Sequence, residues 1–207
     1  MSLLELGSPT TPALAAGSRE RRIADAALRC FARWGVAKTT LDDVAREAGY
    51  SRATVYRFFP GGKDALVQTV ARAEVDQFLD AVGRRLDAVA DQGLEELLVH
   101  GMAEAGRLFL THAPLQYLLL HEPETVLPHL AFRGMDDLLR TAGEFARPWL
   151  ARHLDEETAR RVGEWAARVL LSYVGSPADG VDIGDENSIR PLVRTFLLPG
   201  IITERTQ

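Results

Sequence analysis

The stretch TTLDDVAREAGYSRATVYRFF, residues 39–59, most constrains what this chain can fold into. Thr40 and Asp43 have the spacing of a capping box, in which each side chain accepts a hydrogen bond from the other residue's backbone amide, so a helix should begin there. Gly49 can adopt the left-handed conformation that ends such a helix. Ser51 can cap a second helix, and PGG at residues 60–62 breaks the chain again. The pattern predicts two short helices separated by a tight glycine turn.

Further helices are expected on both sides of this pair. In SRERRIADAALRCFARWG, residues 18–35, Ser18 is the expected N-cap and Gly35 the expected stop. Apolar residues recur there at steps of four, four and three, which indicates one buried helical face. This face consists of Ile23, Ala27, Phe31 and Trp34. A longer helix should run from Lys63 to about Val82. Three such helices, with a tight turn before the third, form a helix-turn-helix, and the longer helix packs beside them.

The remainder of the chain has helical periodicity and no alternating strand pattern. Helices are expected at 93–111, 114–121, 130–153, 156–175 and 188–198, with a loop at 175–188 that is rich in Gly, Pro and Asp. The predicted fold class is therefore all-α. It comprises an N-terminal three-helix helix-turn-helix domain at 19–65 and a C-terminal helical bundle at 66–207. Residues 1–18 have no sustained period and are expected to be a disordered arm.

Charge is distributed unevenly along the chain. Residues 1–65 hold ten Lys and Arg against seven Asp and Glu, which is +3, whereas the remaining residues hold 14 against 22, which is −8. This favours a small cationic module joined to a larger acidic one.

The sequence has no long apolar run and no secretion signal, so we expect a cytoplasmic protein with no membrane partner. Cys30 is alone and the five histidines form no i, i+4 pair, so we predict neither a metal site nor a cofactor.

The second short helix has the properties of a DNA recognition helix. Ala53 lets its backbone approach a groove, and Arg52 and Thr54 can reach base edges. Val55 and Phe59 lie four residues apart and are expected to face inward. Phosphate contacts are expected at the start of the preceding helix and from Lys63, since helix N-termini bind phosphate. The predicted DNA-binding residues are Thr39, Thr40, Ser51, Arg52, Ala53, Thr54, Tyr56, Arg57 and Lys63. The alternative for each charged side chain is ordinary solvation.

Residues 48–66 resemble the recognition segment of the TetR family of bacterial transcription regulators. The family pattern is a glycine turn, then Ser-x-(small)-x-(apolar)-Tyr-x-x-Phe, a short break and Lys-(acid)-x-Leu. Here it is formed by Gly49, Ser51, Ala53, Val55, Tyr56, Phe59, Lys63, Asp64 and Leu66. The resemblance covers about residues 19–70 and implies phosphate or base contacts from Thr39, Thr40, Ser51, Arg52, Tyr56 and Lys63. The chain departs from the pattern at Phe58, where Tyr or His is frequent, and at Gly62, which replaces a polar cap.

Residues 157–175, ETARRVGEWAARVLLSYVG, carry two apolar stripes, and a helix that is apolar on two faces must bury both. The stripe with Trp165 can face the chain's own core. The other stripe contains the small Gly163 and Ala167, which would let a second helix approach closely. With the last helix it is expected to form a two-fold dimer interface, as the resemblance also implies. The predicted interface residues are Gly163, Ala167, Leu171, Val174, Leu192, Val193 and Phe196. The alternative is a core within one chain.

The segments 97–121 and 126–150 are candidates for a ligand cavity, because helical bundles place cavities among apolar and aromatic side chains. The candidate lining residues are Met102, Phe109, Tyr117, His121, Phe132, Met135, Phe145 and Trp149. His112, His129 and Arg133 are further polar candidates. The resemblance implies an effector pocket here, whereas the alternative for each residue is ordinary core.

These features together predict a dimeric DNA-binding transcription regulator, a repressor that binds a near-palindromic double-stranded operator. A small apolar or amphipathic effector would release it. An enzyme is disfavoured, because PGGK is too short for a P-loop and no nucleophile and base can be placed together. The remaining alternative is a helical protein-interaction module that does not read DNA. Strongly salt-dependent binding to duplex DNA would argue against that alternative.

Overall fold

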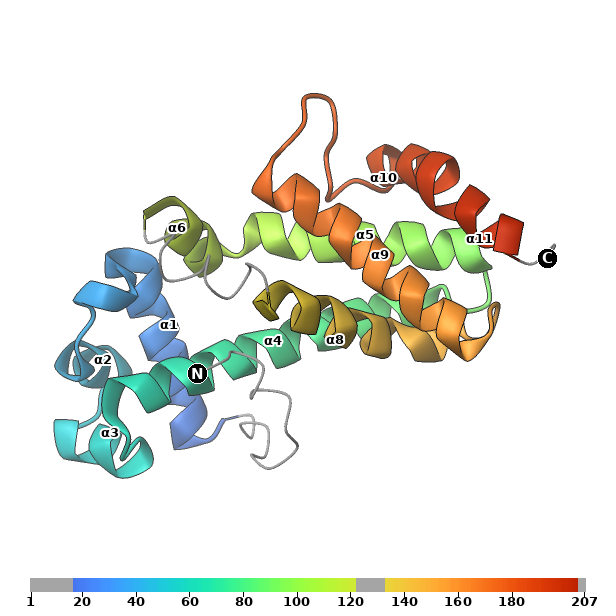
Figure 1. Ribbon diagram of the computed structural model, residues 1–207. Helices are drawn as coiled ribbons and strands as arrows, with labels where there is room; N and C mark the ends of the chain where they lie inside the picture. The colour runs from blue at the N-terminus through green and yellow to red at the C-terminus, as the bar shows by residue number, and fades with distance from the viewer. Residues whose placement is uncertain (1–16, 122–132, 205–207) are drawn as a thin grey trace. The chain divides into compact units, whose positions relative to one another are not determined.

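The computed structural model describes residues 17–121 and 133–204, and these residues form helices without any β-strand (Figure 1). This confirms the all-α fold class for the described chain. Most of the predicted disordered arm at 1–18 lies outside the described residues. The described chain divides into two compact units. Unit 1 comprises residues up to Gln77 together with 112–134, and unit 2 comprises Phe78–Thr111 together with the residues from Met135 onward.

Unit 1 contains the helix-turn-helix. Its helices are α1 (Arg19–Lys38), α2 (Leu41–Ala48), α3 (Arg52–Phe58), the first part of α4 (Gly62–Ala88), and α6 (Ala113–His121). Their apolar faces share one core, whose largest fully buried members include Ile23, Val44, Val55 and Leu66. Trp34 was predicted to continue the buried face of α1, but it is 39% exposed. Beyond Phe31, the buried side of α1 continues with Gly35 and the partly buried Val36.

The end of α1 is more complex than the predicted stop at Gly35. The backbone does leave the helical conformation there, with φ 81° and ψ 164°, but a further helical turn carries α1 to Lys38. Such a positive φ favours glycine, which has no Cβ to clash with the backbone. The hydroxyl of Thr39 donates to the carbonyl of Gly35 at 2.7 Å, so Thr39 closes this turn from inside the core.

Unit 2 is a helical bundle. It contains the rest of α4, α5 (Leu94–Thr111), most of α8 (Arg133–Leu150), α9 (Glu156–Gly175), α10 (Glu186–Leu192), η2 (Val193–Leu197) and α11 (Leu198–Glu204). Its core includes Val99, Ala159, Ile189 and Val193, each at most 1% exposed. The predicted bounds of α5, α6 and α9 agree with these to within one residue. Helix α4 extends to Ala88, beyond the predicted end near Val82.

The predicted final helix at 188–198 is too short. The chain continues helically from α10 through a π-helical turn, η2, into α11. The amide of Leu198 bonds to the carbonyl of Val193 across that turn. Pro199 falls in the first turn of α11, where a helix does not need the N–H that proline lacks.

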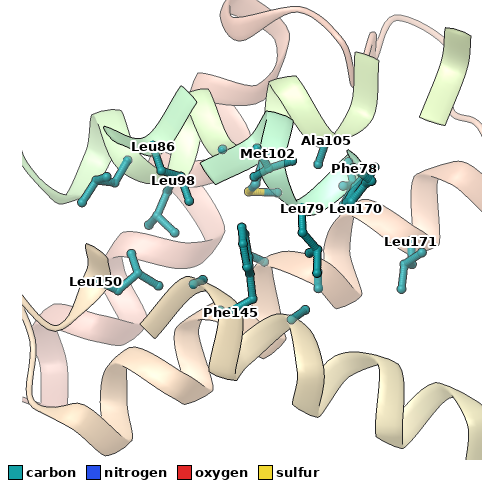
Figure 2. A pocket seen from close by; sticks show the side chains of 18 of the residues that line it. Phe78, Leu79, Leu86, Leu98, Met102, Ala105, Phe145, Leu150, Leu170 and Leu171 are labelled. Carbon is teal, nitrogen blue, oxygen red and sulfur yellow. The ribbon is translucent and has the colours of Figure 1, made fainter. Parts of the chain in front are cut away.

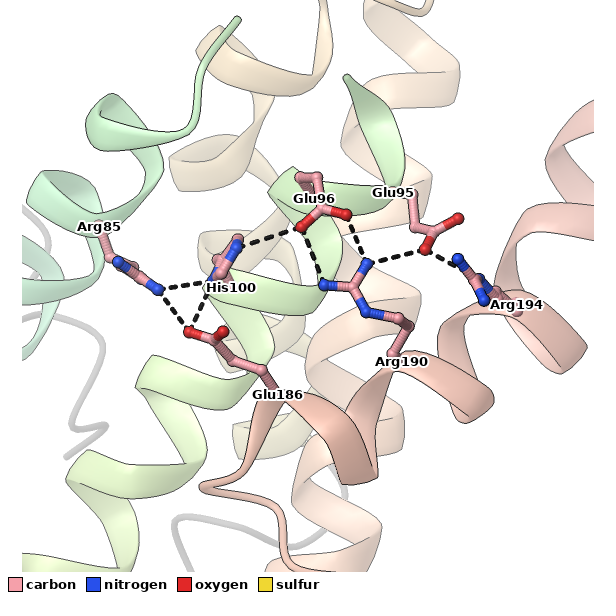
Figure 3. A network of polar contacts seen from close by, with 7 residues as sticks. All are labelled: Arg85, Glu95, Glu96, His100, Glu186, Arg190 and Arg194. Carbon is pink, nitrogen blue, oxygen red and sulfur yellow. Dashed lines mark hydrogen bonds and ion pairs between the residues drawn. The ribbon is translucent and has the colours of Figure 1, made fainter. Parts of the chain in front are cut away.

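A network of ion pairs joins α10 and η2 to the beginning of α5 (Figure 3). Arg190 forms hydrogen bonds with both carboxylate oxygens of Glu96, one of them at 3.0 Å, and with Glu95 at 2.8 Å. Arg194 donates to Glu95 at 2.9 Å. The two glutamates occupy the first turn of α5, where the helix dipole favours negative charge. The bonds from Arg190 lower the pKa of Glu96.

The same network continues from α5 to α4. The side chain of His100 is 11% exposed, and its ring nitrogens lie 3.2 Å from a Glu96 oxygen and 2.7 Å from a Glu186 oxygen. Arg85 of α4 lies 2.7 Å from His100 and also pairs with Glu186 of α10. Charged groups from three helices thus compensate one another on the outside of the bundle. This arrangement holds α4, α5 and α10 in fixed register within unit 2.

We expect Arg190→Leu to lower the midpoint of urea unfolding at neutral pH, because it removes the bidentate partner of Glu96 and leaves Glu95 paired with Arg194. Since Arg190 lowers the pKa of Glu96 below its ordinary 4.5, this stabilisation is present above that pH and is lost as the pH falls through the folded-state pKa. Urea unfolding at neutral pH and at about pH 3 measures the difference.

The matched control is Arg194→Leu, because this side chain is 62% exposed and makes a single ion pair. It should cost less than about 1 kcal/mol. Equal losses for the two variants, or a loss for Arg190→Leu that does not shrink in acid, would contradict this account of the network.

Candidate functional site

The capping box that starts α2 is present as predicted. The hydroxyl of Thr40 accepts from the amide of Asp43 at 3.2 Å, and Asp43 accepts from the amide and the hydroxyl of Thr40 at 3.1 and 2.6 Å. These bonds lower the pKa of Asp43. The side chain of Thr40 lies at the surface, with its hydroxyl already engaged in the cap.

The turn between α2 and α3 depends on Gly49. Its φ of 72° lies in the left-handed region, and its amide bonds to carbonyls at the end of α2. Tyr50 follows, and its amide donates to Ala45 at 2.9 Å, which completes the helix cap. The chain then reverses within three residues, because Ser51 begins the next helix by accepting from the amide of Thr54 at 3.2 Å. The predicted glycine turn and serine cap are both confirmed.

Helix α3 has one buried side and one exposed side. Val55 and Phe59 are 0% and 4% exposed and join the core of unit 1, as the i, i+4 spacing predicted. The rest of its surface presents Arg52, Ala53, Tyr56 and Arg57, all exposed, and Thr54 is partly exposed. The buried side therefore holds α3 so that its cationic and aromatic side chains face outward.

Arg52 is held by two neighbours on this exposed face. Its guanidinium lies 3.1 Å from a carboxylate oxygen of Asp42 on α2 and 3.3 Å from the hydroxyl of Tyr56 one turn along α3. It also lies 5.3 Å from the centre of the Tyr56 ring. The Tyr56 bond and the Asp42 charge raise the pKa of Arg52, so the guanidinium stays charged. Asp42 was not predicted; the acidic first turn of α2 was the available signal.

The side chains of two predicted DNA-binding residues, Thr39 and Lys63, are bonded to backbone carbonyls of the protein itself. Thr39 is 2% exposed and its hydroxyl is bonded to Gly35, so only its backbone could meet a ligand. Lys63 was expected to be a mobile cation, but its ammonium donates to the carbonyl of Ala37 at 2.9 Å. It thereby compensates the carboxyl end of α1. Both residues connect helix ends, which local spacing could not predict.

Unit 2 contains a cavity of about 150 Å³ between α4, α5, α8 and α9 (Figure 2). The described residues that line it are apolar or glycine. Of the predicted pocket residues, Met102, Phe109 and Phe145 line the cavity. The apolar periodicity of these helices predicted buried side chains, but it could not separate those at a cavity from those in close-packed core.

The other predicted pocket residues lie elsewhere. Tyr117 and His121 stack on each other in α6, within unit 1, with ring centres 4.6 Å apart. Trp149 donates to Asp87 at 2.7 Å and does not line the cavity; neither does Met135. Phe132 and His129 lie outside the described residues. His112, a further polar candidate, bonds to Glu74 in unit 1 at 2.9 Å.

Most of the predicted dimer residues face the interior of unit 2. A Cβ added to Gly163 would lie 3.0 Å from the Cα of Gly143 on α8, so this glycine permits a contact between helices of one chain. Ala167 and Leu171 line the cavity, and Val193 is 0% exposed. Within one chain these four residues contribute to the packing of unit 2, and their assignment to a dimer interface stays a prediction.

The stripe of α9 that contains Trp165 is buried at Val162, Ala166 and Leu170. Trp165, which was predicted to face the core, is 57% exposed, and Arg168 lies 5.9 Å from the centre of its ring. On the C-terminal helices Phe196 is 71% exposed, as an interface residue would be in one chain, whereas Val174 and Leu192 are half-buried. Aromatic side chains such as Trp165 and Phe196 are enriched in protein–protein interfaces.

The chemistry available at these sites is binding. Among the described residues, no cluster of three His, Cys, Asp or Glu side chains could hold a metal ion. No helix in the described ranges is long and apolar enough to cross a membrane. The exposed face of α3 is a short helix with two arginines, a tyrosine and no acidic residue, which suits the anionic grooves of a nucleic acid.

Comparison with known proteins agrees with this geometry. The family model of bacterial regulatory proteins of the tetR family matches residues 23–70, which span α2, α3 and parts of α1 and α4. The HTH-type transcriptional regulator TtgW of Pseudomonas putida, described as uncharacterized, is 35% identical over 103 residues, which cover 42% of this chain and 77% of TtgW. SrpR of Pseudomonas putida is 31% identical over 131 residues, 55% of this chain and 62% of SrpR.

BetI of Agrobacterium fabrum, also an HTH-type transcriptional regulator, is 29% identical over 114 residues, so the match covers 55% of this chain and about half, 49%, of BetI. The crystal structure of the TetR family repressor AlkX from Dietzia sp. has the same fold, with a TM-score of 0.61 at 21% identity over 87% of this chain and 98% of AlkX. The motif, the helix-turn-helix and these relatives agree. The chain belongs to the TetR family of helix-turn-helix transcriptional regulators.

Proposed function

We propose that this regulator is a repressor that binds a near-palindromic operator as a homodimer and leaves it when a small molecule occupies the unit 2 cavity. The observation that carries the proposal is the exposed face of α3. There Arg52 is held between Asp42 and Tyr56 on a helix whose other side is anchored in a core. DNA binding, dimer formation and ligand release are separate steps, and each has its own support.

Arg52 is the side chain best placed to read a base. A guanidinium can donate two hydrogen bonds to the O6 and N7 atoms of a guanine in the major groove. Its contacts with Asp42 and Tyr56 restrict its rotamers before DNA arrives, which reduces the entropy lost on binding. Ala53, one residue along, adds no bulk between the helix and the groove. We assign Arg52 to base readout.

Phosphate contacts would then orient the helix. Thr40 and Ser51 are exposed and mark the N-termini of α2 and α3, where backbone amides and the helix dipole favour anions. Tyr56 and Arg57 add donors along the exposed face of α3. These contacts fix register on the duplex, whereas base contacts supply sequence preference.

The dimer would form through the exposed side of α9 and the C-terminal helices. Trp165 and Phe196 are large, exposed and apolar, and aromatic residues of this kind dominate the binding energy of protein interfaces. A two-fold dimer would present two copies of α3 to half-sites about 34–36 Å apart, or further by whole helical turns. The proposed interface on α9 is thereby centred on Trp165 instead of Gly163.

Ligand release would act through α4. This helix begins at Gly62, just after α3, and runs without interruption to Ala88 (Figure 1). Its second half supplies Phe78, Leu79, Val82 and Leu86 to the cavity lining. A ligand that binds more tightly when α4 has a different position would lower the population of the DNA-binding conformation. The size of this shift is set by the ratio of the ligand's affinities for the two conformations.

We expect Arg52→Ala to weaken specific binding to DNA fragments from around the protein's own gene by about 10–100-fold, since a bidentate base contact contributes about 1–3 kcal/mol. Fluorescence anisotropy with labelled fragments measures the affinity. Arg140→Ala is the matched control, because Arg140 is also 62% exposed and also pairs with an aspartate at 3.1 Å. Unchanged affinity of a folded Arg52→Ala protein would refute the assignment of Arg52.

We expect Trp165→Glu to raise the dimer dissociation constant more than tenfold, because it places two charges in the centre of a desolvated interface. Analytical ultracentrifugation over a concentration series measures this constant. Leu110→Glu is the control, since Leu110 is 52% exposed on α5 and lies outside the proposed interface. If Trp165→Glu dimerises as tightly as the wild type does, the interface lies on another face.

A further inference from the structure

The unit 2 cavity differs from an ordinary ligand site in its polarity. Binding pockets usually combine apolar walls with a few polar groups that orient the ligand. Here the described lining residues from all four helices are apolar or glycine, and Leu98, Met102 and Phe145 surround the same space (Figure 2). Apart from the turn of α8 that contains Pro148, the backbone groups of these helices are engaged in helical hydrogen bonds, so a ligand there would find few donors or acceptors.

Polar side chains on the same helices are engaged with protein partners. On α4 and α5, Arg85 and His100 belong to the ion-pair network of Figure 3. Between α4 and α8, the indole N–H of Trp149 donates to Asp87 at 2.7 Å. On α8, the hydroxyl of Thr141 donates to a backbone carbonyl four residues earlier at 2.9 Å. A polar ligand would have to break one of these contacts to form its own.

The size of the cavity restricts the ligand further. A volume of about 150 Å³ is many times that of the small voids in close-packed interiors. An apolar cavity of about that volume, engineered in another protein, stays dry and binds benzene or xenon. Water gains too little inside such walls, so a ligand need not displace ordered water.

We propose that this cavity binds an uncharged hydrocarbon that has no hydrogen-bonding group and is about the size of benzene. A hydroxyl on the ligand would be buried without a partner, and a carboxylate would be buried without a counter-charge, so both groups oppose binding. The assignment narrows the effector predicted from sequence, which was apolar or amphipathic, to the apolar class. Its role as the effector rests on the proposed function, whereas its binding to the cavity does not.

The test uses toluene, phenol and benzoate, which share one ring and differ in polarity. Calorimetric or NMR titration of the full-length wild-type protein should show toluene binding at least tenfold more tightly than phenol, with no measurable binding of benzoate. Ala105→Leu and, separately, Ala167→Leu fill the cavity from α5 and from α9 and should abolish toluene binding. Leu110→Ala, on the exposed side of α5, should leave it unchanged.

Phenol or benzoate binding as tightly as toluene would overturn the proposal, as would undiminished toluene binding in a folded filling variant. If the wild-type protein does not bind toluene, the proposed ligand class is wrong, whatever the variants show. Specific DNA binding by the same protein would then still support its function as a regulator. DNA binding is therefore measured in parallel. If toluene binds but does not release the protein from DNA, a hydrocarbon is the correct ligand class for the cavity but is not the effector.

Discussion

Burial of Val55 and Phe59 in the core of unit 1 determines what α3 can do. A helix of seven residues is too short to be stable alone, so its orientation depends on tertiary packing. With these two side chains buried, Arg52 and Tyr56 lie at the surface beside the buried stripe. The capping box of α2, the left-handed Gly49 and the Ser51 cap then fix the angle at which α3 follows α2. DNA recognition in our account depends on this geometry.

Unit 2 has a cavity in its core and a network of ion pairs between helices on its surface. The apolar side chains around a cavity of about 150 Å³ lack the packing contacts that a filled core would give them. The ion pairs of Arg190 and Arg85 connect three helices on the outside of the same bundle. A bundle that keeps an apolar void, and holds the surrounding helices with charged contacts elsewhere, is suited to bind a small ligand without collapsing. Binding would recover part of the lost packing.

The features that were predicted from sequence are those determined within a few residues. The Thr40–Asp43 capping box, the Gly49 turn, the Ser51 cap and the inward Val55 each follow from local spacing, and all are present. The features that were missed depend on contacts between distant segments. Asp42 meets Arg52 across a turn, and Lys63 reaches the end of α1. On α9, both apolar stripes contribute buried residues, Gly163 from one and Val162, Ala166 and Leu170 from the other, and the sequence pattern alone could not show that Trp165 is exposed.

The central claim is that the exposed face of α3 reads a specific DNA sequence as part of a dimer. Its most direct test is to incubate the purified protein with sheared genomic DNA from the organism that encodes it, at two salt concentrations, and to sequence the retained fragments. We predict a few strongly enriched fragments that share an inverted repeat with half-sites a whole number of helical turns apart, and retention that falls steeply with salt. Retention of fragments in proportion to their abundance by a folded protein, with no shared repeat, would contradict the claim.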